Sequence, residues 1–151
     1  LKNVILSITW ASATVLFPIC LYEYYLTDNE LIFMFFRRFF FIYALTVIYD
    51  LRDLETDQKA GIHTIALRFG ERVTKIWSLI SLMLFMVFIV TDPALSAPHT
   101  RNLSAALFIS AIIAILITLN THKIRNKSYF AFVVDSPMIL QFLLVLLFSQ
   151  V

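Results

Sequence analysis

Long apolar stretches constrain this chain more than any other feature of its sequence. Five of them approach the roughly 20 residues that a helix needs to cross the hydrocarbon core of a bilayer. Hydrophobic residues make up 60% of the 151 residues and charged residues only 15%, which is far outside the range of a soluble domain. We therefore predict an all-α fold, a polytopic membrane helical bundle that has the lipid bilayer as a partner and no nucleic acid. The predicted spans cover about residues 4–22, 31–49, 73–90, 103–119 and 129–151.

Local signals predict where several helices bend or end. Pro18 lies late in the first span and should kink it, because proline cannot donate a backbone hydrogen bond. Gly61 is a plausible C-cap for a helix that continues beyond the second span. Residues 64–69 read as a short amphipathic piece that ends at Gly70, and Asn102 is a reasonable N-cap for the fourth span.

Three aspartates follow the second apolar stretch directly. Asp50, Asp53 and Asp57 are spaced at i, i+3 and i+7, so in a continuous helix they would lie within roughly 60° of one another. Like charges on one stripe repel, and a fold that keeps them needs a cation. Carboxylate oxygens suit Mg²⁺ or Ca²⁺, and Mg²⁺ commonly takes one or two carboxylates together with substrate phosphates. The spacing predicts a diphosphate–Mg²⁺ site at the membrane surface, and the alternative is a solvated acidic helix end.

The segment around these aspartates resembles the second Asp-rich motif of the UbiA superfamily of intramembrane prenyltransferases. That motif has the form Asp-x-x-Asp-x-x-x-Asp, followed by a basic residue, a Gly, and a Thr-containing stretch that ends in Gly. The matching residues are Asp50, Asp53, Asp57, Lys59, Gly61, Thr64 and Gly70. The resemblance implies a bundle of nine spans around a central cavity, in which residues 1–151 are the C-terminal part, about spans five to nine.

The same resemblance implies a reaction. Members transfer a polyprenyl group from its diphosphate to an aromatic or lipid acceptor, and Mg²⁺ held by Asp50, Asp53 and Asp57 would neutralise the leaving group. We expect loss of Asp53 or Asp57 to abolish substrate binding and loss of Asp50 to be milder. The family's first Asp-rich motif, Asn-Asp-x-x-Asp, does not occur in this sequence, and the chain begins with Leu. We therefore expect a fragment that is inactive by itself.

Four further residues are candidates for substrate binding. Tyr43 lies on the predicted Asp50 face, where an aromatic ring could stabilise a carbocation, although such aromatic stripes are also ordinary packing. Lys59 and Arg68 stand in the basic connection after the aspartates and could contact a diphosphate. Asp135 lies about 10 Å into the last span and resembles an aspartate that family members often carry there. It either faces the central cavity or forms a structural ion pair.

Two arginines interrupt the second span. Arg37 and Arg38 lie at helical angles of about 140° and 240° from Asp50, which places both on the back of that helix. We predict that their side chains snorkel towards the interface or pair with groups inside the bundle.

The positive charges are distributed unequally between the two sides of the membrane. Arg101 is alone on one side of the predicted topology, and by the positive-inside rule the other side is cytoplasmic and carries the Asp-rich motif. The cytoplasmic set is Lys2, Arg52, Lys59, Arg68, Arg72, Lys75, Lys123, Arg125 and Lys127. Two other functions stay open: an intramembrane ion or proton carrier that uses Asp135, and a non-catalytic membrane subunit.

Overall fold

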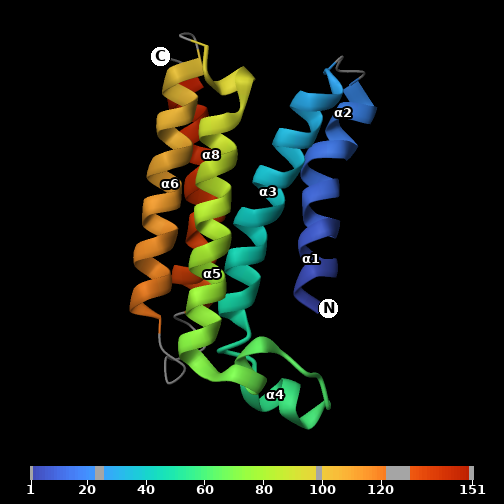
Figure 1. Ribbon diagram of the computed structural model, residues 1–151, viewed down its shortest axis with the longest axis vertical. Coiled ribbons are helices and arrows are strands. Elements are labelled where there is room, and N and C mark those ends of the chain that lie inside the picture. Colours follow the sequence, from blue (N-terminus) through green and yellow to red (C-terminus); the bar gives the residue numbers. More distant parts are fainter. Residues whose placement is uncertain (1, 23–25, 98–99, 122–129, 150–151) are drawn as a thin grey trace.

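The computed structural model describes residues 2–22, 26–97, 100–121 and 130–149. Within those ranges the chain forms helices and short connections, with no β-strand. The long helices run along one axis of a narrow bundle, and α4 lies at the same end as the N-terminus (Figure 1). The helices are α1 Lys2–Ala11, α2 Phe17–Tyr22, α3 Asp28–Tyr49, α4 Leu54–Lys59, α5 Ile65–Thr91, α6 Arg101–Asn120 and α8 Ser136–Ser149.

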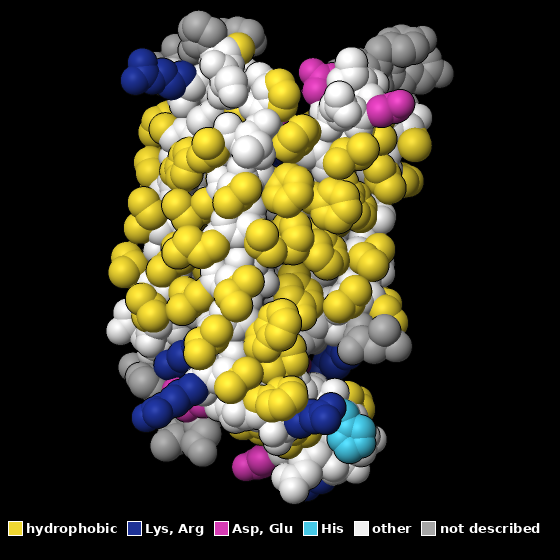
Figure 2. Space-filling view, viewed as in Figure 1, with side chains coloured by type: hydrophobic (Ala, Val, Ile, Leu, Met, Phe, Trp, Pro, Cys, Tyr) yellow, Lys and Arg dark blue, Asp and Glu magenta, His cyan; other side chains and the backbone are white. Residues whose placement is uncertain are grey.

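Four helical runs are long and apolar enough to cross a membrane. They are Lys2–Leu21, Asp28–Tyr49, Ile65–Thr91 and Arg101–Asn120, and the helix Phe132–Phe148 is apolar but shorter. Figure 2 shows apolar side chains over the middle of the visible face and charged side chains near its two ends. The predicted all-α membrane bundle is confirmed, although the fifth predicted span is shorter within the described residues than its 129–151 range.

Helix α3 is the centre of the packing. It contacts α1 on one side and α5 on the other, while α6 and α8 pack together beyond α5 (Figure 1). Ala44, Ala111 and Ala114 are fully buried in this core, which lets the backbones approach closely where lipid tails provide no hydrophobic drive between helices. The start of α3 is fixed by a capping box between Thr27 and Glu30.

The first span is interrupted before Pro18. A π-helical stretch, Ser12–Leu16, separates α1 from α2. The proline ring would clash with the carbonyl group four residues earlier in a regular α-helix, and a wider turn relieves that clash. The predicted disturbance is therefore present, and it takes the form of a π-helical segment.

The Asp-rich segment does not continue α3, so the premise of one carboxylate stripe was wrong. Helix α3 ends at Tyr49, the chain turns through residues 50–53, and α4 begins at Leu54. The turn changes the directions of the three aspartate side chains, and their final positions depend on tertiary contacts.

The glycine predictions agree with the structure, whereas the Asn102 cap was wrong. Gly61 follows α4 with φ 66°, and Gly70 bends α5 with φ 78° and ψ −179°, so residues 65–69 form a short separate piece. Both conformations are readily available only to glycine. Helix α6 already includes Arg101, and Thr100 precedes it.

Candidate functional site

Two of the predicted aspartates converge on one cation that the chain itself supplies. The Lys2 Nζ atom lies 2.9 Å from Asp57 Oδ1 and 3.0 Å from Asp57 Oδ2, and 3.9 Å from Asp50 Oδ1. Asp50 and Asp57 are 1% and 3% exposed. Buried carboxylates need a partner, and the Lys2 ammonium is a positive charge that both of them share.

Helix α1 also fixes the orientation of Asp50. The Asn3 Nδ2 group donates a hydrogen bond of 2.7 Å to Asp50 Oδ2. One turn further along, the hydroxyl groups of Ser7 and Thr46 lie 3.4 Å apart. All of these residues are buried, so polar contacts run along the α1–α3 interface and end at the carboxylate.

Burial raises the pKa of the Asp50 carboxyl group to about 6, and the nearby Asp57 and Asp53 carboxylates act in the same direction. The hydrogen bond from Asn3 and the charge of Lys2 oppose this rise. Asp50 lies just beyond the end of the second span. Burial and neighbouring negative charge, which raise the pKa of this carboxyl group, also make binding of a further cation favourable.

Asp53 is paired with a different cation from the one that Asp50 and Asp57 share. The Arg52 guanidinium group donates to both Asp53 oxygens, at 2.7 Å and 3.0 Å. The same group lies over the Tyr49 ring, 4.5 Å from its centroid. Across the described part of the chain, no three His, Cys, Asp or Glu residues gather closely enough to hold a metal ion by themselves.

A cavity of about 310 Å³ opens beside these groups. We call it the carboxylate cavity. Asp57 is absent from its lining and contacts it through Lys2. Its lining combines charged groups at the helix ends with apolar side chains further into the bundle. The lining residues are Lys2, Asn3, Leu6, Trp10, Ile42, Thr46, Tyr49, Asp50, Arg52, Asp53, Asp135 and Met138.

Comparison with known proteins decides the family. The model of the UbiA prenyltransferase family matches residues 1–134, which include the Asp-rich segment and most of the lining of the carboxylate cavity. The chain belongs to the UbiA prenyltransferase family. Searches of curated proteins and of solved structures gave no match. Family membership supports a prenyltransferase-type activity, and the apolar helices make this UbiA chain a multi-pass integral membrane protein.

Of the four other predicted site residues, only Asp135 lines the carboxylate cavity of this UbiA chain. It is exposed and lies at the junction between the π-helical stretch Phe130–Val134 and α8. Lys59, the last residue of α4, and Arg68, near the start of α5, are both exposed. Tyr43 stacks on Phe39 with ring centroids 5.8 Å apart, and it is not part of this lining.

Sequence reasoning missed the contributions of α1 to the site. Lys2 was interpreted only as a topology signal, and Asn3 was not considered, yet they hold Asp57 and Asp50 across separations of 55 and 47 residues. No local pattern marks such a pair. The basic residues Lys123, Arg125 and Lys127, predicted on the same side of the membrane, lie outside the described residues.

Proposed function

We propose that this chain supplies one Asp-rich half of a Mg²⁺-dependent site that transfers a polyprenyl group from its diphosphate to an aromatic or lipid acceptor. The observation that carries the proposal is the position of Lys2 Nζ between Asp50 and Asp57. The family match makes prenyl transfer the reaction to expect. Two buried carboxylates around one cation are an arrangement that could bind the Mg²⁺ of such a site.

The donor set fits a hard divalent cation. Asp50 and Asp57 would hold Mg²⁺ in place of the Lys2 ammonium, since carboxylate oxygens are its preferred protein ligands and substrate phosphates complete its shell. Bound there, Mg²⁺ supplies charge neutralisation for a leaving diphosphate. Lys2 is 41% exposed at its side chain, so its ammonium group can move into solvent when another cation takes its place.

The chain's own residues would position the substrate. Asn3 holds Asp50 in one orientation by its 2.7 Å hydrogen bond. Arg52 presents a planar guanidinium group at the same cavity, a geometry that suits phosphate oxygens. Leu6, Trp10 and Met138 give the cavity an apolar part that suits a prenyl chain and excludes water from it.

The charge distribution supports a cytoplasmic location for this end of the bundle. Lys2, Arg52, Lys59 and Arg68 gather at the end that carries α4 and the N-terminus, and Arg101 begins α6 at the other end (Figure 1). Short cytoplasmic connections of membrane proteins carry the excess of Lys and Arg. We place the Asp-rich segment on the side where soluble diphosphates and Mg²⁺ are available.

Binding of a labelled polyprenyl diphosphate to the chain in lipid nanodiscs tests the proposal. With Mg²⁺ present, Asp50→Asn and Asp57→Asn should each weaken binding at least about tenfold, while Glu55→Gln, an exposed acid on the same segment, should leave it unchanged. Asp53→Asn should have the smallest effect of the three, because Asp53 already has Arg52 as a partner. This order differs from the one that the resemblance implies, in which Asp50 is the mildest.

The family's other Asp-rich motif does not occur in these 151 residues, so we expect the chain alone to give no turnover. The experiment therefore measures binding. Binding that persists in both the Asp50 and Asp57 variants would overturn the proposed site. Binding that is independent of Mg²⁺ in the unaltered chain would overturn the role of the cation.

A further inference from the structure

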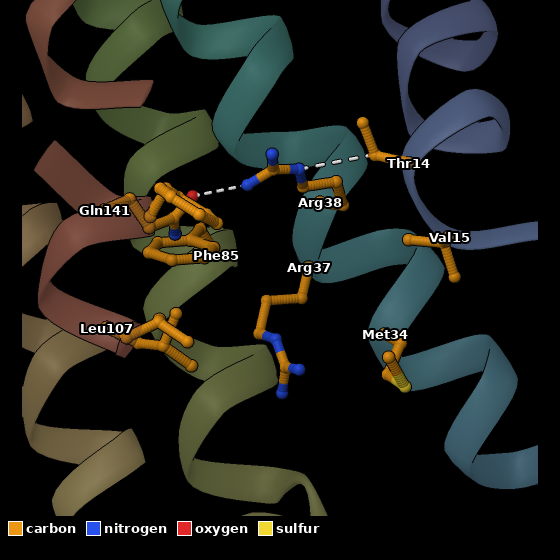
Figure 3. Close-up of a pocket in the computed structure, with 10 residues that line it drawn as sticks. Thr14, Val15, Met34, Arg37, Arg38, Phe85, Leu107 and Gln141 are labelled. Atoms are coloured by element: carbon orange, nitrogen blue, oxygen red, sulfur yellow. Dashed lines mark hydrogen bonds between the residues drawn. The ribbon is translucent and has the colours of Figure 1, made fainter. Parts of the chain in front are cut away.

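A second cavity of about 310 Å³ lies between α3 and its neighbours, away from the Asp-rich segment. Arg37 and Arg38 of α3 line it together with Gln141 of α8 and apolar side chains from the π-helical stretch Ser12–Leu16, α5 and α6 (Figure 3). We call it the arginine cavity. Along α3, Arg38 precedes Asp50 by 12 residues, or about 18 Å at 1.5 Å per residue. The two cavities are therefore at different depths of the bundle.

Arg37 has a charged partner. Its Nη1 atom donates to Asp92 Oδ2 at 2.6 Å, and the Asp92 side chain is 1% exposed. The other Asp92 oxygen accepts the Ala94 backbone N–H group at 3.0 Å. One buried carboxylate thus neutralises one guanidinium group, which is the pairing that a charge inside a membrane protein requires.

Arg38 has only neutral partners among the residues that the structure describes. Its Nη1 atom donates to the Gln141 side-chain oxygen at 2.6 Å, and its Nε atom donates to the Thr14 hydroxyl group at 3.3 Å. Figure 3 shows its guanidinium group reaching across the cavity between these two side chains. An arginine keeps its proton in proteins, so this positive charge stays. Among the residues that line or pair across the cavity in the described chain, two cations face one carboxylate.

The excess charge lies within the apolar part of the second span. Arg37 and Arg38 follow the start of α3 by nine and ten residues, or about 14 Å and 15 Å along the helix. A cation at that depth is costly unless it has an anionic partner or water. The guanidinium group is a planar fork whose N–H groups match the two oxygens of a carboxylate or a phosphate.

We propose that the arginine cavity binds the singly charged oxyanion head of an amphiphile dissolved in the membrane, either a carboxylate or a phosphate. The excess of one positive charge fits a monoanion, unlike the diphosphate proposed for the carboxylate cavity. Met34, Leu107 and Val145 line the rest of the cavity and suit an apolar tail. Phe142, another lining residue, is 63% exposed, so the cavity reaches the surface of the bundle where lipid would lie.

The test is equilibrium binding of labelled ligands to the full chain in nanodiscs of phosphatidylcholine, which has no net charge. The probes are oleate, the monoanionic phosphodiester oleyl methyl phosphate and the uncharged oleyl alcohol, at a pH at which the fatty acid is ionised. At least one of the two anions should bind at least about tenfold more tightly than the alcohol. Preference for oleate assigns a carboxylate head and preference for oleyl methyl phosphate assigns a phosphate head.

Variants locate the binding. Arg38→Gln should weaken anion binding about tenfold or more, which corresponds to about 1.4 kcal/mol. Arg101→Gln removes an exposed arginine at the start of α6 and should leave binding unchanged. Arg38→Lys keeps the positive charge but loses the planar guanidinium group, so its affinity for the anion should lie between those of Arg38→Gln and Arg101→Gln. Circular dichroism of each variant checks that the bundle remains helical.

Photo-crosslinking keeps the proposal testable if Arg38→Gln does not fold. An oleate analogue with a diazirine group on its tail should label Met34, Phe142 or Val145 in the unaltered chain, and excess oleate should suppress that labelling. Equal affinities for the anions and the alcohol would overturn the proposal. So would labelling confined to Leu6 and Trp10 of the carboxylate cavity.

Discussion

Helix α3 carries two polar sites whose charges are unbalanced in opposite directions. At its C-terminal end, Asp50 and Asp57 share the single ammonium group of Lys2. In its middle, Arg37 and Arg38 face the single carboxylate of Asp92. The first site lies at a helix end, where its lysine is partly exposed, and the second lies within the span. The same size of charge imbalance should therefore have different energetic consequences at the two sites.

The depth of each site sets the size of the effect. Solvent and mobile ions can compensate a charge at the end of a span, whereas a charge within it depends on fixed partners. Removing one partner should cost more in the arginine cavity than near the Asp-rich segment, and an added inorganic ion should compensate the loss only near the Asp-rich segment. Three measurements of unfolding free energy separate these behaviours.

The largest effect is expected from breaking the Arg37–Asp92 pair. Arg37→Gln should lower the free energy of unfolding by about 3 kcal/mol or more, because it leaves the buried Asp92 carboxylate without its counter-charge. Asp92→Asn should lower the free energy of unfolding by a similar amount, because it leaves Arg37 without its counter-charge. The double variant should lose much less than the sum of the two single losses. The measurement is a double-mutant cycle by reversible unfolding in mixed micelles. Simple addition of the two losses would show that the residues do not depend on each other.

An intermediate effect is expected from the neutral partner of Arg38. Gln141→Leu should lower the free energy of unfolding by about 2 kcal/mol, since a 2.6 Å hydrogen bond to a charged group is lost. Thr14→Val is the matched control: its bond is 3.3 Å long and exposed, so it should change stability by less than about 0.5 kcal/mol. Equal losses in the two variants would contradict the assignment of Gln141 as the main partner.

The smallest effect is expected from Lys2, and it should depend on the divalent cation. Lys2→Gln should lower the free energy of unfolding by about 1 kcal/mol or less, because a partly exposed ion pair is screened by solvent. Mg²⁺ should then raise the melting temperature of Lys2→Gln more than that of the unaltered chain, since the ammonium no longer competes for the carboxylates. NaCl of equal ionic strength is the control. The same Mg²⁺ response in both proteins would show that Lys2 does not occupy the cation position.

The predictions from sequence succeeded where the signal is local. The length of the apolar stretches predicted the four long apolar helices, and glycines at positions 61 and 70 predicted the end of α4 and the bend in α5. Arg37 and Arg38 were predicted either to snorkel towards the interface or to pair inside the bundle, and the structure shows both paired. The prediction of a continuous helix through Asp50, Asp53 and Asp57 failed, because apolar periodicity stops at Tyr49 and cannot indicate how the chain turns next.

The sequence by itself therefore determined the membrane class, the approximate spans and the family, since each depends on residue types at short spacings. The catalytic and metal-binding roles of Asp50, Asp53 and Asp57 stay predictions. Only the tertiary structure decided that Asp57 and Asp50 meet Lys2 and Asn3, and that Arg38 meets Gln141 across 103 residues of chain. The physical reason is that a buried charge takes whichever partner the packing of helices brings within hydrogen-bonding distance, and that packing is not encoded in any short stretch of sequence.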